Sequence, residues 1–162
     1  MPEESDFISL IETHQRIIHK VCNLYMQDAQ DKKDLFQEII LAAWKGYPQF
    51  KGEARFSTWL YRVALNTAIT FFRKEQRQPV TAPLPEQLIL ANDNNEAITE
   101  QLTVMHQAIA QLSAVDKALV MLYLEDYNYN EMGDMMGITA NNVAVKMNRI
   151  KTRLRETVRK LT

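Results

Sequence analysis

The chain has 162 residues, of which 46% are hydrophobic and 24% charged, and its formal net charge is −1. This length allows one domain or two small ones. No apolar run approaches the roughly 20 residues that cross a bilayer, and the acidic start MPEESDF is unlike a signal peptide. A single cysteine excludes an internal disulfide and suits the cytoplasm. The chain has only four glycines and is rich in Leu, Ile, Met, Ala, Gln and Glu, a composition that predicts an all-helical protein.

Three helices are predicted in the first part of the chain. Residues 6–26 place their apolar side chains on one helical stripe, and a second helix is predicted from Asp31 to Lys45. The loop GYPQFKGEARFS, with one proline and two glycines, follows the second helix. The third helix is expected to begin near Thr58, with Ser57 as its N-cap.

The third helix has two chemically distinct faces at 100° per residue. One face is a broad apolar arc, formed by Leu60, Tyr61, Ala64, Leu65, Ala68, Phe71 and Phe72. The opposite side is a row of polar and basic residues that begins with a tryptophan: Trp59, Arg62, Asn66, Thr70 and Arg73. Trp59 therefore either contacts a binding partner or packs under the preceding loop.

Residues 76–96 differ in character from the helices on either side. They contain three of the chain's five prolines and then the polar cluster ANDNNE, so they are the best linker candidate. Further helices are predicted around Leu102–Leu112 and over Ala114–Leu124. The predicted organisation is a first domain, a linker and a second domain, at residues 1–76, 77–97 and 98–162.

The segment YNYNEMGDMMGITANNVAVKMNRIKTRLRE has the pattern of a helix-turn-helix. Gly133 has no side chain where the two helices would cross, and Gly137 permits a left-handed turn. Ile138 would fill the angle between the helices, and Thr139 would cap the second one. A buried apolar seam is then expected at spacings of three and four residues, through Val143, Met147, Ile150, Leu154, Val158 and Leu161.

Opposite charges occupy different parts of the chain. Residues 50–77 carry six basic and two acidic side chains, and residues 139–162 carry seven and one. The two remaining stretches, residues 1–49 and 78–138, are net acidic. Two separate basic blocks suggest two places that meet phosphate, although solvated helix faces would show the same charges.

Amide and basic side chains flank the seam of the last helix: Asn141, Asn142, Lys146, Asn148, Arg149, Lys151, Arg153 and Arg155. Asn can pair bidentately with adenine, whereas Lys and Arg bind guanine and phosphate. This composition is expected of a helix whose start enters the major groove of DNA. A helical hairpin with a soluble surface is the alternative; the glycine placement and the basic end favour DNA binding.

The chain resembles a sigma factor of the sigma-70 family, in the small extracytoplasmic-function group that has only regions two and four. The strings DLFQE, FKGE, TWLYR and NTA follow the order and spacing of region two, and the helix-turn-helix resembles region four. The resemblance implies an all-α fold of two small helical domains joined by a flexible linker. It also implies a non-enzymatic protein that binds bacterial core RNA polymerase and promoter DNA.

In such proteins the helix bearing DLFQEIILAAWK docks on the clamp helices of the largest polymerase subunit. The helix also has a stripe of residues that are not needed to fill the hydrophobic core of the protein. This stripe supplies the candidates for the polymerase contact: Asp34, Gln37, Glu38 and Leu41. Lys45 lies on the same stripe, but it is better explained as an ordinary exposed lysine.

The loop FKGEARF corresponds to the one that captures a base flipped out of the promoter minus-ten element. The resemblance assigns a set of residues to this pocket, namely Phe50, Lys51, Gly52, Glu53 and Asn66. An aromatic wall gives roughly 1–3 kcal/mol per stacked base, comparable with the cost of base extrusion. Phosphate contacts are expected from nearby basic side chains, namely Lys51, Arg55, Arg62 and Arg73.

Region four is expected to read the minus-35 element. Family members often carry a basic residue where this chain has Ala144, and another, in region two, where it has Leu65. Since Ala144 cannot bind phosphate or a base, the minus-35 contacts of region four are expected mainly from other residues: Asn141, Asn142, Lys146, Asn148, Arg149 and Arg153. The linker is expected to thread toward the RNA exit path, where its acidic stretch Asp93–Glu100 either mimics nucleic acid or is a soluble tether. A restraining anti-sigma partner, frequently membrane-bound, is also implied.

A helix-turn-helix regulator that binds DNA without polymerase is the main alternative, but it would not need FKGEARFSTWLYR. An enzyme is disfavoured because no His joins Asp31, Asp34 and Glu38 at metal-ligand spacing, and no glycine-rich phosphate loop is present. Cys22 lies beside the apolar stripe of the first helix and is expected in the core. The sequence therefore predicts no metal, no cofactor and no small-molecule substrate.

Overall fold

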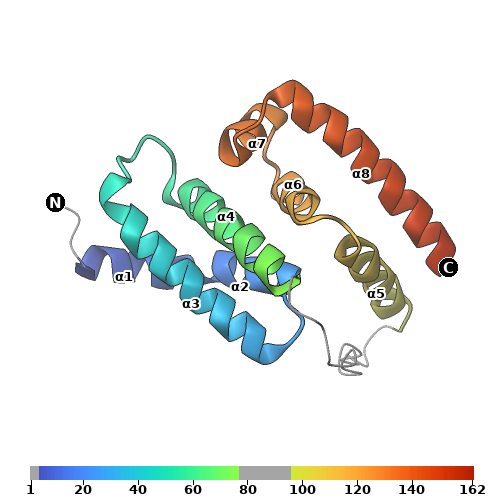
Figure 1. Cartoon of the computed structure of the whole chain (residues 1–162), viewed down its shortest axis with the longest axis horizontal. Coiled ribbons are helices and arrows are strands. Elements are labelled where there is room, and N and C mark those ends of the chain that lie inside the picture. Colours follow the sequence, from blue (N-terminus) through green and yellow to red (C-terminus); the bar gives the residue numbers. More distant parts are fainter. Residues whose placement is uncertain (1–3, 77–95) are drawn as a thin grey trace. The chain divides into compact units, whose positions relative to one another are not determined.

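The structure, a computed structural model of the chain, describes residues 4–76 and 96–162. These residues form helices and turns without any β-strand, as Figure 1 shows, and the prediction of an all-α fold is therefore confirmed. The chain divides into two compact units, Met1–Val80 and Thr81–Thr162. Most of the predicted linker lies outside the described residues, and its last two positions belong to the first turn of α5.

The first unit contains α1 (Glu4–Thr13), α2 (Gln15–Tyr25), α3 (Ala29–Gly46), the 3₁₀ helix η1 (Tyr47–Gln49) and α4 (Phe56–Gln76). Helix α4 packs against both α2 and α3, which also contact each other. The centre of this packing consists of apolar side chains with no measurable exposure: Ile18, Val21, Leu35, Ile39, Leu60, Ala64 and Leu65. The predicted apolar arc of α4 is thus its core face, although Phe71 and Phe72 are only half-buried.

The predicted first helix is in fact two helices. Its apolar stripe continues without a break, but the chain turns at His14. The backbone N–H and the ring Nδ1 of His14 both donate to the carbonyl oxygen of Leu10, at 3.1 and 2.8 Å. The His14 ring also lies 5.0 Å from that of Phe56 in α4. The prediction of one helix was wrong because the backbone of His14 leaves helical geometry, with φ −112° and ψ 18°, and its ring is held by Leu10 and Phe56, which the stripe does not reveal.

Helix α4 begins earlier than predicted. Its first residue is Phe56, and the N–H of Trp59 donates to the carbonyl oxygen of Arg55 at 3.0 Å, so Arg55 rather than Ser57 is the N-cap. Phe56 is buried and contacts the rings of Phe50 and Trp59. Tertiary packing of Phe56 therefore outweighs the capping preference of serine.

The second unit contains α5 (Glu96–Ala110), α6 (Ala114–Leu124), α7 (Tyr129–Met136) and α8 (Ala140–Leu161). Helix α6 has the predicted bounds. Helices α5, α6 and α7 all pack against α8. The core of this unit includes seven buried apolar side chains: Leu119, Leu122, Met132, Met135, Val143, Met147 and Ile150.

The apolar seam of α8 is fully buried only in its first half. After Ile150, Leu154 and Val158 are half-buried, and Leu161 is 41% exposed. Helix α8 has 22 residues, so these last apolar positions lie far along the helix from the turn that joins it to α7. The prediction of a continuous buried seam was therefore wrong at the carboxyl-terminal end.

Candidate nucleic-acid interface

The turn between α7 and α8 has the geometry that the sequence predicts. Gly137 adopts φ 74° and ψ 31°, a left-handed conformation, at the end of α7. The N–H of Ile138 donates to the carbonyl oxygen of Gly133 at 3.0 Å. A Cβ atom on Gly133 would lie 2.5 Å from the carbonyl oxygen of Ile138, so only glycine fits where the helices cross.

Side chains cap both helices of the motif. Oδ1 of Asn128 accepts from the N–H of Glu131 at 2.8 Å, and Oε1 of Glu131 accepts from the N–H of Asn128 at 3.0 Å. At the start of α8, Oγ1 of Thr139 accepts from the N–H of Asn142 at 3.1 Å. The predicted Thr139 cap is confirmed, and the first turn of α8 is held in place by the protein itself.

Most of the predicted minus-35 residues lie exposed on α8, namely Asn141, Asn142, Asn148, Arg149 and Arg153. Lys146 is half-buried. Nη2 of Arg153 donates to the carbonyl oxygen of Gln111, just beyond the end of α5, at 3.4 Å. Because cations are favourable at helix carboxyl ends, this contact stabilises the unit itself, a role that the sequence did not indicate.

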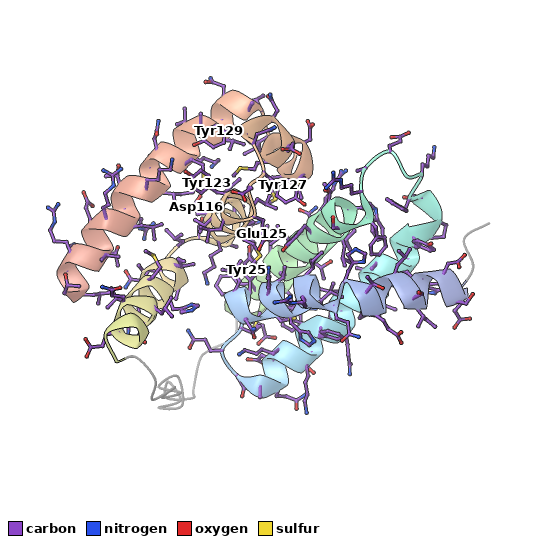
Figure 2. The ribbon with its side chains drawn as sticks, turned by 180° about the vertical axis from the view of Figure 1, so that it is seen from behind. Tyr25, Asp116, Tyr123, Glu125, Tyr127 and Tyr129 are labelled. Atoms are coloured by element: carbon purple, nitrogen blue, oxygen red, sulfur yellow. The ribbon has the colours of Figure 1, made fainter. Side chains whose placement is uncertain are left out.

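Lys151 is directed toward the fold rather than away from it. Its Nζ lies 4.6 Å from the ring centroid of Tyr123 in α6. Hydrogen bonding to Tyr123 raises the pKa of Lys151, with a smaller contribution from Tyr129; both tyrosines are labelled in Figure 2. Lys151 therefore connects α8 to its neighbours and does not belong to the outward face of α8.

In the first unit, the loop between η1 and α4 forms an exposed segment. Lys51, Gly52, Glu53 and Arg55 are exposed, whereas Phe50 is half-buried. Gly52 has φ 74°, which L side chains rarely adopt, and no atom lies within 4 Å of the position of a Cβ. Backbone conformation rather than space therefore favours glycine at this position.

Phe50 rests on three aromatic rings that we call the aromatic floor: Tyr47, Phe56 and Trp59. The centroid of Phe50 lies 5.3 Å from Trp59, 5.7 Å from Phe56 and 6.3 Å from Tyr47. Trp59 in turn lies 5.5 Å from Phe56 and 6.4 Å from Tyr47. These separations are typical of favourable aromatic pairs. Trp59 thus packs under the loop, which is one of the two roles that its position on the polar face of α4 suggests.

The polar row of α4 continues from this floor. Arg62, Asn66, Thr70 and Arg73 are all exposed, on the side opposite the buried arc. Asn66 follows Trp59 by seven residues, close to two helical turns, so it lies on the same face as the floor. The structure thus groups an aromatic ring, an amide and several guanidinium groups on one side of the unit, and such a surface can hold a base and its phosphates.

A second surface of the first unit includes the predicted polymerase contacts. All of them are exposed on α3 and form what we call the α3 stripe: Asp34, Gln37, Glu38 and Leu41. Nε2 of Gln30, one turn earlier, donates to Oδ1 of Asp34 at 3.0 Å. Burial, followed by the charges of Asp28 and Asp34, raises the pKa of Asp31. The start of α3 therefore presents a concentration of carboxylates.

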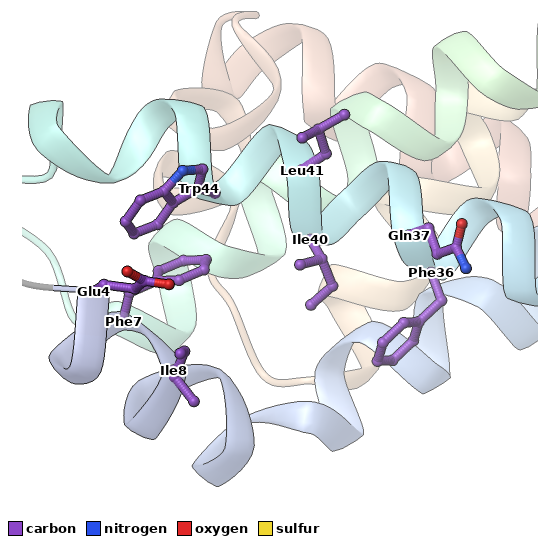
Figure 3. Close-up of a pocket in the computed structure, with 8 residues that line it drawn as sticks. All are labelled: Glu4, Phe7, Ile8, Phe36, Gln37, Ile40, Leu41 and Trp44. Atoms are coloured by element: carbon purple, nitrogen blue, oxygen red, sulfur yellow. The ribbon is translucent and has the colours of Figure 1, made fainter.

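An apolar groove between α1 and α3 adjoins this stripe, as Figure 3 shows. Its lining consists of Glu4, Phe7, Ile8, Phe36, Gln37, Ile40, Leu41 and Trp44. Ile8, Leu41 and Trp44 are 47%, 48% and 42% exposed. Phe7 lies 5.1 Å from Trp44 and 5.2 Å from Tyr47, so ring contacts connect the groove with the aromatic floor. Sequence reasoning missed the groove because its two walls come from separate helices.

Within residues 4–76 and 96–162, no group of three or more His, Cys, Asp or Glu side chains is placed to hold a metal ion. The same residues include no helix with the length and apolar character that a membrane span requires.

Cys22 is buried as predicted, and burial raises the pKa of its thiol to about 11. At neutral pH this thiol is therefore protonated and behaves as a core side chain.

Two family models match the chain. The model described as sigma-70 region 2 matches residues 10–78, and the model described as sigma-70, region 4 matches residues 102–154. The first match includes the α3 stripe, the exposed loop and the aromatic floor. The second includes the helix-turn-helix and the exposed face of α8.

Three curated relatives match over most of their length. The ECF RNA polymerase sigma factor SigM of Mycobacterium tuberculosis is 27% identical over 151 residues, which cover 91% of this chain and 74% of SigM. The RNA polymerase sigma-H factor of Pseudomonas aeruginosa is 29% identical over 156 residues, which cover 82% and 77%. The ECF RNA polymerase sigma factor SigW of Bacillus subtilis is 24% identical over 183 residues, which cover 98% and 92%.

Two solved structures have a similar fold. The sigma factor RpoE from Bartonella quintana, solved in complex with the anti-sigma factor NepR, has a TM-score of 0.70 at 18% identity, over 95% of this chain and 97% of RpoE. CnrH, solved in complex with the cytosolic domain of CnrY, has a TM-score of 0.69 at 16% identity, over 99% and 92%.

Proposed function

The chain belongs to the sigma-70 family of RNA polymerase sigma factors, in the extracytoplasmic-function group, and we propose that it directs core polymerase to promoters with particular minus-35 and minus-ten elements. The observation that carries this proposal is the exposed loop at 50–55, which lies beside an aromatic floor and the polar row of α4. A regulator that merely binds duplex DNA through α8 has no use for this surface.

At the minus-ten element, the first unit captures a flipped base. The floor covers part of the Phe50 ring, and the part that remains exposed provides a surface for stacking. Stacking contributes about 1–3 kcal/mol per base, which offsets the few kcal/mol that extrusion costs. Asn66 supplies the amide that closes the pocket, together with the exposed loop residues Lys51, Gly52 and Glu53. The basic side chains around it hold phosphates: Lys51, Arg55, Arg62 and Arg73.

At the minus-35 element, the first three turns of α8 enter the major groove. Asn141, Asn142 and Asn148 have amides that suit adenine, and Arg149 and Lys146 suit guanine or phosphate. Arg153 approaches the phosphates at the edge of this surface, where its contact with Gln111 holds its side chain in place. The Thr139 cap and the Gly137 turn orient the helix for this contact.

The α3 stripe and the adjoining groove form the proposed contact with core polymerase. Exposed Leu41 lies in both, so the same patch offers apolar area and, through Asp34 and Glu38, negative charge. An anti-sigma partner is proposed as well, because both similar solved structures are complexes with a partner chain and RpoE is bound to an anti-sigma factor. Neither contact requires a cofactor or a small-molecule substrate.

Reconstituted transcription tests the proposed function. The chain is mixed with bacterial core RNA polymerase and a library of genomic fragments, and the 5′ ends of the transcripts are sequenced. New start sites that share two upstream elements are expected only when the chain is present. Absence of both new start sites and a complex with core would refute the sigma assignment, and DNA binding without core would support the regulator instead.

Leu41→Lys is expected to weaken binding to core polymerase by about tenfold or more, because a charge would be desolvated in an apolar contact. Leu41 is 48% exposed, so the fold should tolerate the change. Fluorescence anisotropy of the labelled chain titrated with core measures the affinity. Asn23→Lys, which adds the same charge to an exposed position on α2, is the matched control and should bind normally. Equal affinities of the two variants would exclude Leu41 from the contact.

A further inference from the structure

Val145 is an exposed apolar residue on the face of α8 that carries the asparagines. Its side chain is 49% exposed, and the other large apolar side chain exposed on α8 is Leu161, at the end of the helix. Val145 lies instead in the second turn, close to the Thr139 cap. It was not among the candidate DNA contacts, because sequence reasoning selected amide and basic side chains.

The spacing of α8 places Val145 at the centre of its outward face. Asn141 precedes it by four residues, and Asn148 and Arg149 follow it by three and four, so these exposed side chains surround it. The buried residues Val143 and Met147 are two positions away on either side and point to the core. Val145 therefore faces whatever its polar neighbours face.

Folding does not account for a valine at this position. A β-branched side chain is a poorer helix former than Ala, Lys or Glu, and the second unit gives Val145 only partial burial in return. Its polar neighbours match the donors and acceptors of base edges and phosphates. The one apolar group that a base presents in the major groove is the C5-methyl of thymine.

We propose that Val145 helps to determine promoter specificity by packing against the C5-methyl group of a thymine in the minus-35 element. This inference rests on the proposed function, since it requires α8 to enter the major groove of promoter DNA. Asn141, Asn148 and Arg149 contact the neighbouring bases or phosphates. Burial of one methyl-sized group strengthens binding about fourfold, which is a selectable preference at one base pair.

The first experiment uses the full chain with core polymerase. Promoters carry a randomised minus-35 window, while the spacer and the minus-ten element come from a promoter identified by mapping of transcript starts. Wild type is expected to enrich thymine at one position of one strand, and Val145→Ser is expected to lose that preference while other positions keep theirs. Unchanged thymine enrichment in Val145→Ser would overturn the inference.

The second experiment removes only the methyl group from the DNA. Uracil replaces the enriched thymine in the selected promoter, and holoenzyme affinity is measured for both DNAs. Wild type should bind the uracil promoter about fourfold more weakly, whereas Val145→Ser should bind the two equally. Val145→Thr, which keeps a methyl group, should retain the thymine preference. Equal binding of both promoters by wild type would overturn the inference.

Thr152→Ser is the matched control. Thr152 is exposed two turns after Val145 on the same side of α8, and its Oγ1 donates to the carbonyl oxygen of Asn148 at 3.0 Å. Serine removes one methyl group there, and the thymine preference should remain. Equal losses in Thr152→Ser and Val145→Ser would overturn the inference.

Failure of wild type to initiate anywhere would refute the proposed function itself, whereas initiation from an element without a thymine preference overturns only the role of Val145.

Discussion

Replacing Gly133 with alanine is expected to destabilise the second unit by about 3 kcal/mol, because the added methyl group has no space. Its Cβ would lie 2.5 Å from the carbonyl oxygen of Ile138 and 3.3 Å from the backbone nitrogen of Ala140. Both atoms belong to the backbone, so a change of rotamer cannot relieve the overlap. The turn must open, and the packing of α7 against α8 is then weakened. Hydrogen exchange of peptides from residues 129–161 measures this loss.

Two of the other glycines provide graded controls for this prediction. Gly137→Ala adds a side chain at φ 74° with no atom within 4 Å, so it should cost only about 1 kcal/mol of conformational strain. Gly46→Ala places its Cβ 3.4 Å from Cζ2 of Trp59 and should change stability little. Peptides of the first unit should exchange normally in Gly133→Ala. Protection of α7 and α8 equal to that of wild type would show that the crossing tolerates a side chain.

Phe50→Ala is expected to slow promoter opening about tenfold while leaving the affinity for core polymerase unchanged. Loss of the exposed ring surface removes a stacking contribution of about 1–3 kcal/mol per base. Permanganate reactivity of unpaired thymines follows opening, and anisotropy of the labelled chain measures core binding. Asn66→Ala should act in the same direction, because Asn66 is exposed on the same face as the aromatic floor.

Two further variants at position 50 separate stacking on DNA from packing on the floor. Phe50→Tyr preserves the ring and should open promoters almost normally. Phe50→Leu still covers the floor residues Tyr47, Phe56 and Trp59 but offers no aromatic face, so it should share the opening defect of Phe50→Ala. Normal opening by Phe50→Leu, or an equal loss of opening and core binding in Phe50→Ala, would instead assign Phe50 a structural role.

Features that depend on neighbours in the sequence were predicted well. The bounds of α6 match the prediction, as do the left-handed Gly137 and the Thr139 cap. Each of these depends on residues within one or two turns of the chain, so the local pattern contains the necessary information. The close approach at Gly133 was predictable for the same reason, since the contact is with Ile138 in the following turn.

Features that depend on distant residues were not predicted. The turn at His14 involves Phe56 in another helix, and the start of α4 depends on the packing of the same Phe56. Arg153 bonds to Gln111, 42 residues earlier. The groove needs Ile8 and Trp44 from two helices. A periodic pattern identifies which face of a helix is apolar, but it does not identify the helix that covers that face.

The two tryptophans of the chain lie on different proposed contact surfaces of the first unit. Trp44 lines the groove between α1 and α3, and Trp59 belongs to the aromatic floor under the loop. Each surface thus contains one intrinsic fluorophore. In a Trp44→Phe chain all indole emission arises beneath the loop, and in a Trp59→Phe chain all of it arises in the groove. Exclusion of water shifts indole emission to shorter wavelengths, so each of these single-tryptophan chains reports on the covering of its own surface by any partner that contributes no indole emission.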